Sequence, residues 1–130
     1  MSEEYIDFVN SVTSKSTKNQ SDLLEALDFM EEQGATPSRL LTTALGLNGE
    51  ASEFSELIKK CIFQGREYTD EVHAELKSEL SDIMWYIAQA CIALGISLED
   101  VLDTNTQKLE ARYPDGFEAF RAENRKEGDI

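Results

Sequence analysis

The sequence predicts an all-α protein, a helical bundle of about four to five helices. Three observations favour this fold class. Apolar residues recur at three- and four-residue spacing along most of the chain. Capping residues and glycine stops separate these stretches, and no segment shows the alternating β-branched pattern of a strand. Because the expected connections are short, the helices are expected to pack beside one another.

The N-terminal third is expected to hold two helices. The first covers residues 3–13, and its apolar positions are Tyr5, Phe8, Val9 and Val12. Residues 14–21 contain only polar side chains and are expected to form a loop. Ser21 is the expected N-cap of a second helix, which runs to about Gln33 and stops at Gly34.

A long third helix is expected from about Ser38 to Phe63. The Thr36-Pro37-Ser38 segment is a helix-start signal that leaves either Thr36 or Ser38 as the cap. Gly46 and Gly49 lie inside this helix, where each costs about 1 kcal/mol relative to alanine. The helix is expected to break at Gln64-Gly65-Arg66.

Two further helices are expected in the C-terminal half. Thr69 caps a helix from Asp70 to about Leu94, which ends at Gly95. Ser97 caps the last helix, with Asp100 as the second half of a capping box, and this helix stops before Pro114. In the charged tail that follows, Phe117 and Phe120 are candidates to dock on the bundle.

Length and composition predict one domain spanning residues 1–130, with a metal-binding core at about 38–117. The net charge of -14 argues against a nucleic-acid-binding surface, which needs clustered Lys and Arg. There is no signal-peptide pattern and no apolar run of membrane-spanning length, so a cytoplasmic location without membrane attachment is expected. Cys61 and Cys91 are expected to be structural thiols, because His73 is the only histidine and there is no CxxC pair.

Two carboxylate pairs lie beside apolar stripes of the two longest expected helices. At roughly 100° per residue, Glu50 falls inside the stripe of its helix and Glu53 at its edge. Glu79 and Asp82 occupy the matching positions on the next long helix. Acids on a helix surface are usually solvated, and Lys59, Lys60 or Lys77 could neutralise these four, although only in part.

Several carboxylates near one interior are unfavourable unless a positive group lies among them. Oxygen ligands without His or Cys suit a hard cation, so the four acids predict a site for Mg²⁺, with Mn²⁺ as the alternative. A di-iron carboxylate bundle is disfavoured, because it would need Glu-x-x-His pairs and His73 lies outside both acid pairs.

These motifs resemble the MazG-like all-α nucleoside triphosphate pyrophosphohydrolases. Gly46-Leu47-x-Gly49-Glu50-x-x-Glu53 and then Glu79-x-x-Asp82 with Trp85-Tyr86 are similar to the family's ExxE and ExxD signature. The segment from Asn105 to Phe117 is similar to its C-terminal stretch. The resemblance covers about residues 38–117, and the compact length is most similar to MazG-like proteins of phages. Residues 1–37 match none of its motifs.

The resemblance implies Mg²⁺-dependent hydrolysis between the α and β phosphates, giving a nucleoside monophosphate and pyrophosphate. It implies Glu50, Glu53, Glu79 and Asp82 as metal ligands, with Glu53 as the catalytic residue that positions or deprotonates water. Candidate substrate contacts are Lys60, Tyr86, Asn105, Lys108 and Arg112. Tyr86 and Trp85 are either base contacts or core aromatics, and Arg112 is either a substrate contact or part of a structural turn.

The resemblance also implies a homodimer or homotetramer with sites near the interface, and, for a phage-encoded protein, the host cytoplasm. The phage-like character favours deoxynucleotides such as dGTP or dCTP. A non-catalytic module of the same fold, which senses nucleotides or binds another protein, is the alternative function.

Overall fold

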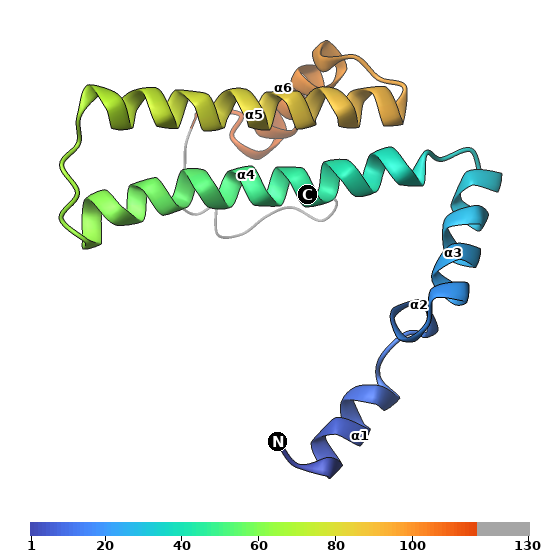
Figure 1. The fold of residues 1–130 in the computed structure, drawn as a ribbon. Helices are drawn as coiled ribbons and strands as arrows, with labels where there is room; N and C mark the ends of the chain where they lie inside the picture. Colours follow the sequence, from blue (N-terminus) through green and yellow to red (C-terminus); the bar gives the residue numbers. More distant parts are fainter. Residues whose placement is uncertain (117–130) are drawn as a thin grey trace.

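A computed structural model describes residues 1–116 and confirms the all-α fold class (Figure 1). Apart from a single bridge between Pro114 and Gly116, these residues form helices, turns and loops. The helices within this range are α1 (Glu3–Ser11), α2 (Lys15–Lys18), α3 (Gln20–Glu32), α4 (Pro37–Phe63), α5 (Asp70–Leu94) and α6 (Leu98–Arg112). The predicted docking of Phe117 and Phe120 falls outside the described residues.

The short helix α2 corrects the prediction of a loop over residues 14–21. Ser14 caps it by accepting a hydrogen bond from the Thr17 backbone N–H at 3.3 Å. The Ser14 and Thr17 hydroxyls are also 3.0 Å apart, so the cap involves both side chains. Because a single helical turn needs no apolar face, hydrophobic periodicity did not reveal it.

Helix α3 begins two residues earlier than predicted. Its N-cap is Asn19, whose Oδ1 accepts from the Asp22 backbone N–H at 3.1 Å. Ser21, the predicted cap, instead donates its hydroxyl hydrogen to the same Asn19 oxygen at 3.1 Å. Both residue types favour N-cap positions, and the backbone geometry selects the first of them.

Helices α4 and α5 pack side by side as an antiparallel hairpin (Figure 1). At the open end, the Thr36 hydroxyl donates to the Ala93 carbonyl at 3.1 Å, which joins the start of α4 to the end of α5. Thr36 holds the N-cap position of α4 without capping through its side chain, and Pro37 follows at the first turn. Thr69 caps α5 as predicted, accepting from the Val72 N–H at 3.3 Å.

The hairpin contains the small apolar core of the described residues. Val72 is 1% exposed, Leu57 is 7% exposed and Cys91 is 9% exposed. Cys61 is half-buried, and both cysteines are free thiols. The core thus lies along the α4–α5 seam, where it fixes the two helices against each other.

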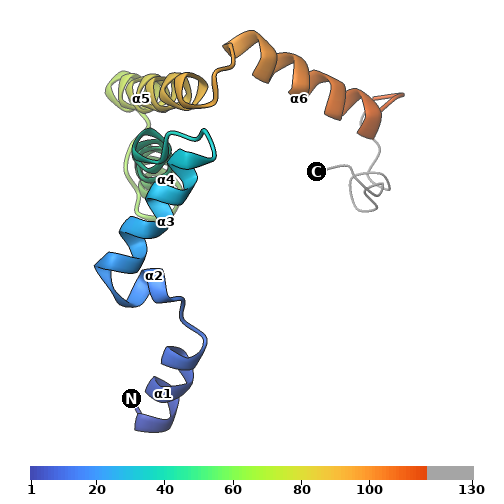
Figure 2. The same ribbon diagram turned by 90° about the vertical axis from the view of Figure 1, so that its right-hand side faces the viewer.

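The remaining helices extend away from the hairpin. Gly95 adopts the left-handed conformation (φ 67°) that ends α5, and α6 leaves at 97° to α5. Ser97 and Asp100 form the predicted capping box at the start of α6. Figure 2 shows α6 and the arm made of α1, α2 and α3 pointing away from the hairpin in different directions.

This arrangement leaves many large apolar side chains exposed on the arm and on α6. On these elements they include Tyr5, Phe8, Leu23, Leu24, Phe29, Leu98, Leu102 and Leu109. Among residues 1–116, no single helix has the length and apolar character to cross a membrane. The bent α5–α6 pair meets that standard only when its two helices are taken together.

Candidate metal centre

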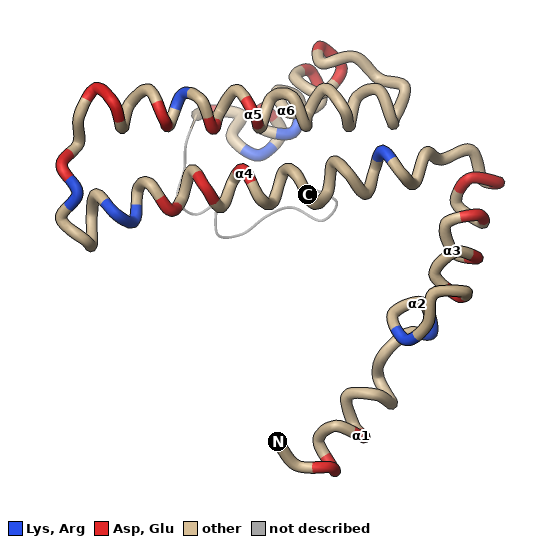
Figure 3. Tube along the Cα trace, viewed as in Figure 1, with Lys and Arg blue, Asp and Glu red and all other residues tan. Residues whose placement is uncertain are grey.

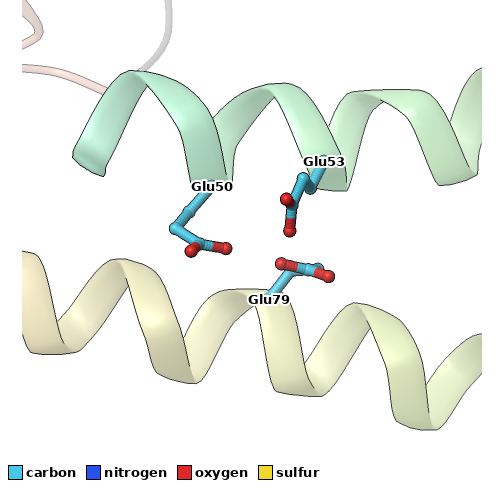
Figure 4. Close-up of side chains that lie close together, drawn as sticks. All are labelled: Glu50, Glu53 and Glu79. Atoms are coloured by element: carbon cyan, nitrogen blue, oxygen red, sulfur yellow. The ribbon is translucent and has the colours of Figure 1, made fainter. Parts of the chain in front are cut away.

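Three carboxylates meet in the middle of the α4–α5 hairpin. Glu50 and Glu53 project from α4 and Glu79 projects from α5 into the space between the helices (Figure 4). One carboxylate oxygen of each residue lies within 4.8 Å of the others. We call Glu50, Glu53 and Glu79 the acid cluster.

Helical geometry explains how these residues come together. Residues three apart lie on the same face of a helix, so Glu50 and Glu53 both face α5. The antiparallel packing then brings Glu79 opposite them (Figure 4). Glu50 and Glu79 are half-buried, whereas Glu53 is exposed to solvent. The cluster therefore has a closed side along the seam and an open side at Glu53.

Two oxygens of the acid cluster are buried without a hydrogen-bond partner. They are Oε2 of Glu50 and Oε2 of Glu79. Two ionised carboxylates can only accept hydrogen bonds, so neither group can satisfy the other while both are charged. A buried acceptor left unpaired costs free energy, and a proton or a cation between these oxygens would remove that cost.

The proximity of the acids shifts the titration of Glu79. The nearby Glu50 carboxylate, with which Glu79 can share a proton, is the main cause that raises the pKa of Glu79 to about 7. Burial contributes next, followed by proton sharing with Glu53 and the negative charges of Glu53 and Glu50. The cluster therefore holds a proton near neutral pH that an isolated glutamate would release.

The ion pairs of the hairpin do not neutralise the acid cluster. Lys59 pairs with Glu56 at 3.1 Å, and Arg66 pairs with Glu75 at 3.0 Å. Across residues 1–116, neither Lys60 nor Lys77 forms an ion pair with a cluster acid. Figure 3 shows acidic positions in the middle of the hairpin, with the basic positions of α4 near its ends. Neutralisation by lysine, which the sequence left open, is therefore not seen in this part of the chain.

The acid cluster fits a hard divalent cation. Its donors are all carboxylate oxygens, the ligand type that Mg²⁺ and Mn²⁺ prefer. A cation bound beside the two unpartnered buried oxygens would compensate for the contacts with water that they lose on burial. The open side at Glu53 leaves room for water or a substrate oxygen in addition to the protein ligands.

Asp82, the fourth predicted metal ligand, lies outside the acid cluster. It follows Glu79 by three residues on α5 and is exposed. The structure therefore brings together three of the four predicted ligands, with Asp82 next to them along the helix. The sequence placed Asp82 at the edge of the apolar stripe, and its exposure agrees with that position.

Two predicted substrate contacts lie on the hairpin. Lys60 is half-buried on α4, and Tyr86 is half-buried on α5. The Tyr86 ring packs against the α4 backbone at Gly46. Trp85 meets Tyr86 edge to face, with ring centroids 4.9 Å apart and planes at 88°, and remains exposed.

The other three predicted substrate contacts lie on α6, away from the acid cluster. Asn105 and Lys108 are exposed. Arg112 is half-buried, and its guanidinium carbon lies 5.9 Å from the centre of the Tyr113 ring. Because α6 points away from the hairpin (Figure 2), this single chain does not bring these residues to the cluster.

The sequence left open whether Gly46 permits the close approach of a neighbouring helix or ligand, and it did not identify the partner. The position of Gly46 inside a long helix marked it as unusual, because glycine destabilises helix interiors. The partner that explains it, Tyr86, lies on another helix, and one sequence does not give the register between two helices. The unusual glycine was visible in the sequence, but its contact with Tyr86 follows only from the packing of α4 against α5.

Comparisons with known proteins agree with the sequence motifs. A family described as "MazG nucleotide pyrophosphohydrolase domain" matches residues 38–117. The chain is also 36% identical over 83 residues to the "Gene 37 protein" of Mycobacterium phage L5. That similarity covers 62% of this chain and 72% of the phage protein. No solved structure gives a significant match.

Proposed function

Because the chain belongs to the MazG nucleotide pyrophosphohydrolase family, we propose that it hydrolyses nucleoside triphosphates between the α and β phosphates. The reaction consumes one water and yields a nucleoside monophosphate and pyrophosphate. We propose Mg²⁺ as the cofactor, with Mn²⁺ as a substitute, and deoxynucleotides such as dGTP or dCTP as preferred substrates. The observation that carries this proposal is the acid cluster with its two unpartnered buried oxygens.

We assign the metal-ligand role to Glu50, Glu53 and Glu79, joined by Asp82. A bound Mg²⁺ would neutralise phosphate oxygens and lower the pKa of a coordinated water. Glu53 is the exposed member of the cluster, so its carboxylate has access to solvent on the open side. We therefore assign to Glu53 the additional role of orienting the attacking water and accepting its proton.

We assign the substrate contacts to Lys60, Tyr86, Asn105, Lys108 and Arg112. Lys60 and Tyr86 lie on the same hairpin as the acids. The three α6 residues require a second copy of the chain, because α6 points away from its own acid cluster (Figure 2). In this proposal the protein is a homodimer or homotetramer, in which α6 of one protomer lies beside the hairpin of another.

The accessible surface supports the oligomer. The exposed leucines Leu98, Leu102 and Leu109 are four and seven residues apart, so they lie on one face of α6 and form a stripe suited to packing. Sedimentation of the purified protein tests this part of the proposal, and a stable monomer would contradict it.

The substrate is a free nucleotide and not a nucleic acid. A net charge of -14 disfavours contact with a phosphate polymer. A single triphosphate can still bind where a metal inverts the local charge. We propose the cytoplasm as the location of this activity, or the host cytoplasm if a phage encodes the protein.

The deciding experiment measures pyrophosphate release from a panel of ribo- and deoxynucleotides, including dGTP, dCTP and dUTP, with and without Mg²⁺. We expect Mg²⁺-dependent release from at least one of them. Glu53→Gln and Asp82→Asn are each expected to abolish turnover and to preserve helicity measured by circular dichroism. Nucleotide binding without pyrophosphate release from any member of the panel would instead favour a nucleotide-sensing module.

A further inference from the structure

Gly46 lets an aromatic ring lie directly on the backbone of α4. A Cβ atom at position 46 would overlap with Cε1, Cζ and Cδ1 of Tyr86. The space that any other side chain would fill is therefore occupied by the ring. Gly49, the other glycine inside α4, has no atom within 4 Å of the equivalent Cβ position. The close approach is thus specific to Gly46.

The Gly46–Tyr86 contact belongs to the same helix faces as the acid cluster. Gly46 precedes Glu50 by four residues, or about one helical turn of 5.4 Å. Tyr86 follows Glu79 by seven residues, or two turns, on the facing helix. The ring therefore lies one to two helical turns from the acid cluster along the α4–α5 seam.

The hydroxyl end of the Tyr86 ring remains available to a ligand. Cζ, which carries the hydroxyl group, is one of the atoms that cover Gly46, so the ring reaches across to α4. Tyr86 is half-buried, and its hydroxyl makes no hydrogen bond with any described residue. Trp85, in edge-to-face contact at 4.9 Å, supports the ring from the α5 side.

We propose that Gly46 is a positioning residue for the nucleoside part of the substrate. It acts through Tyr86, since the absence of a side chain at position 46 sets where the ring and its hydroxyl stand beside the acid cluster. This inference rests on the proposed function and adds to it the residue that determines the shape of the nucleoside side of the site. A side chain at position 46 would displace the ring and leave the three carboxylates in place.

The test compares Gly46→Ala with Gly49→Ala, its matched control on the same helix. Both changes add one methyl group and improve helix propensity. We expect Gly46→Ala to raise the KM of the best nucleotide substrate at least tenfold, with kcat changed less than threefold. Gly49→Ala is expected to retain the wild-type KM. Calorimetric Mn²⁺ affinity is expected to stay within twofold for both variants, because neither position ligates metal.

A second pair of variants separates positioning from a general loss of structure. Tyr86→Ala removes the ring, so in that background Gly46→Ala is expected to change KM no further. In the Tyr86→Ala background, Gly46→Ala is also expected to cause no further loss of the thermal midpoint, because the ring with which its methyl group overlaps is absent. Binding of the α,β-methylene analogue of the best substrate is expected to follow the same order, which gives a readout independent of turnover.

Each outcome decides one statement. If the wild-type protein hydrolyses a nucleotide and Gly46→Ala behaves like Gly49→Ala, the role of Gly46 is overturned and the proposed function stands. Additive effects of Gly46→Ala and Tyr86→Ala on KM would also overturn it, because they would show that Gly46 does not act through the ring. If the wild-type protein hydrolyses none of the panel, the proposed function fails, and with it the substrate role of Gly46.

Discussion

Glu50 and Glu79 face each other across the α4–α5 seam, and each buries one carboxylate oxygen that has no hydrogen-bond partner. Such an arrangement is unfavourable for the folded protein by itself, since two buried acceptors lose their contacts with water. It becomes favourable when a proton or a metal ion binds between them. Glu50 and Glu79 therefore link the stability of the fold to pH and to metal binding. Both dependences can be measured separately from turnover.

The first prediction concerns pH in the absence of metal. The pKa of Glu79 is raised from 4.5 to about 7 in the folded protein, chiefly because Glu79 can share a proton with the nearby Glu50 carboxylate. Between these values the folded state holds a proton that the unfolded state has released, so stability falls as pH rises from about 4.5 to about 7. In EDTA, the thermal midpoint of the wild-type protein should fall over this pH range, whereas the midpoint of Glu79→Gln should not show this fall. Glu25→Gln, an exposed acid on α3, should keep the wild-type slope.

The second prediction concerns the metal. A cation must displace the proton on Glu79, so Mn²⁺ or Mg²⁺ should bind more tightly at pH 8 than at pH 5.5 and release protons below about pH 7. At a free metal concentration one hundred times the Kd, stabilisation of about 2.7 kcal/mol is expected. Calorimetry in buffers of different ionisation enthalpy measures the released protons. Equal affinity at both pH values would contradict a site that includes Glu79.

The third prediction concerns the core that holds the two helices together. Leu57 is 7% exposed and follows Glu53 by one turn. Leu57→Ala should lower the free energy of unfolding by about 2–5 kcal/mol, because it opens a cavity in a small core. Lys77→Ala, an exposed position on α5, should stay within about 0.5 kcal/mol of wild type. Urea unfolding measures the free energy of unfolding of each variant. A decrease of less than about 1 kcal/mol for Leu57→Ala would argue against the packing of Leu57 between α4 and α5.

The fourth prediction concerns the start of α5. The Thr69 hydroxyl accepts a hydrogen bond from the Val72 backbone N–H at 3.3 Å, and Val72 has the most buried side chain among the core residues of the hairpin. Thr69→Ala should cost about 1 kcal/mol of stability, whereas Thr69→Ser should retain most of the wild-type value. Chemical unfolding of the three proteins measures the difference. Equal losses for alanine and serine would show that the hydroxyl is not the stabilising group.

Local chemistry explains which parts of the fold could be predicted. The caps at Thr69 and Ser97 and the stop at Gly95 depend on neighbours within a few residues, so the sequence contains all that is needed. Asn19 and Ser21 are both good caps, and the choice between them depends on a backbone conformation that the residue types do not specify. The polar turn α2 has no apolar face to reveal it.

In the candidate site, too, the features that depend on one helix could be predicted, whereas those that depend on how the helices are arranged could not. Helical periodicity predicted which face of its own helix carries each of Glu50, Glu53 and Glu79, because that face depends only on positions within the helix. The direction of α6 depends on the turn after Gly95, so spacing along the chain could not place Asn105 or Lys108. The pairing of Gly46 with Tyr86 depends on the register between two helices, and no pattern within either helix encodes it.

The connection between α4 and α5 is separated from the chemistry by a long stretch of helix. From Glu53 to the end of α4 at Phe63 the chain rises about 15 Å, and Leu57 and Val72 fix the helices within that length. The segment 64–69 is therefore a suitable place to cut and rejoin the chain or to insert a tag or reporter domain. A chain reopened there would keep its carboxylates facing one another, provided that α4 and α5 still dock.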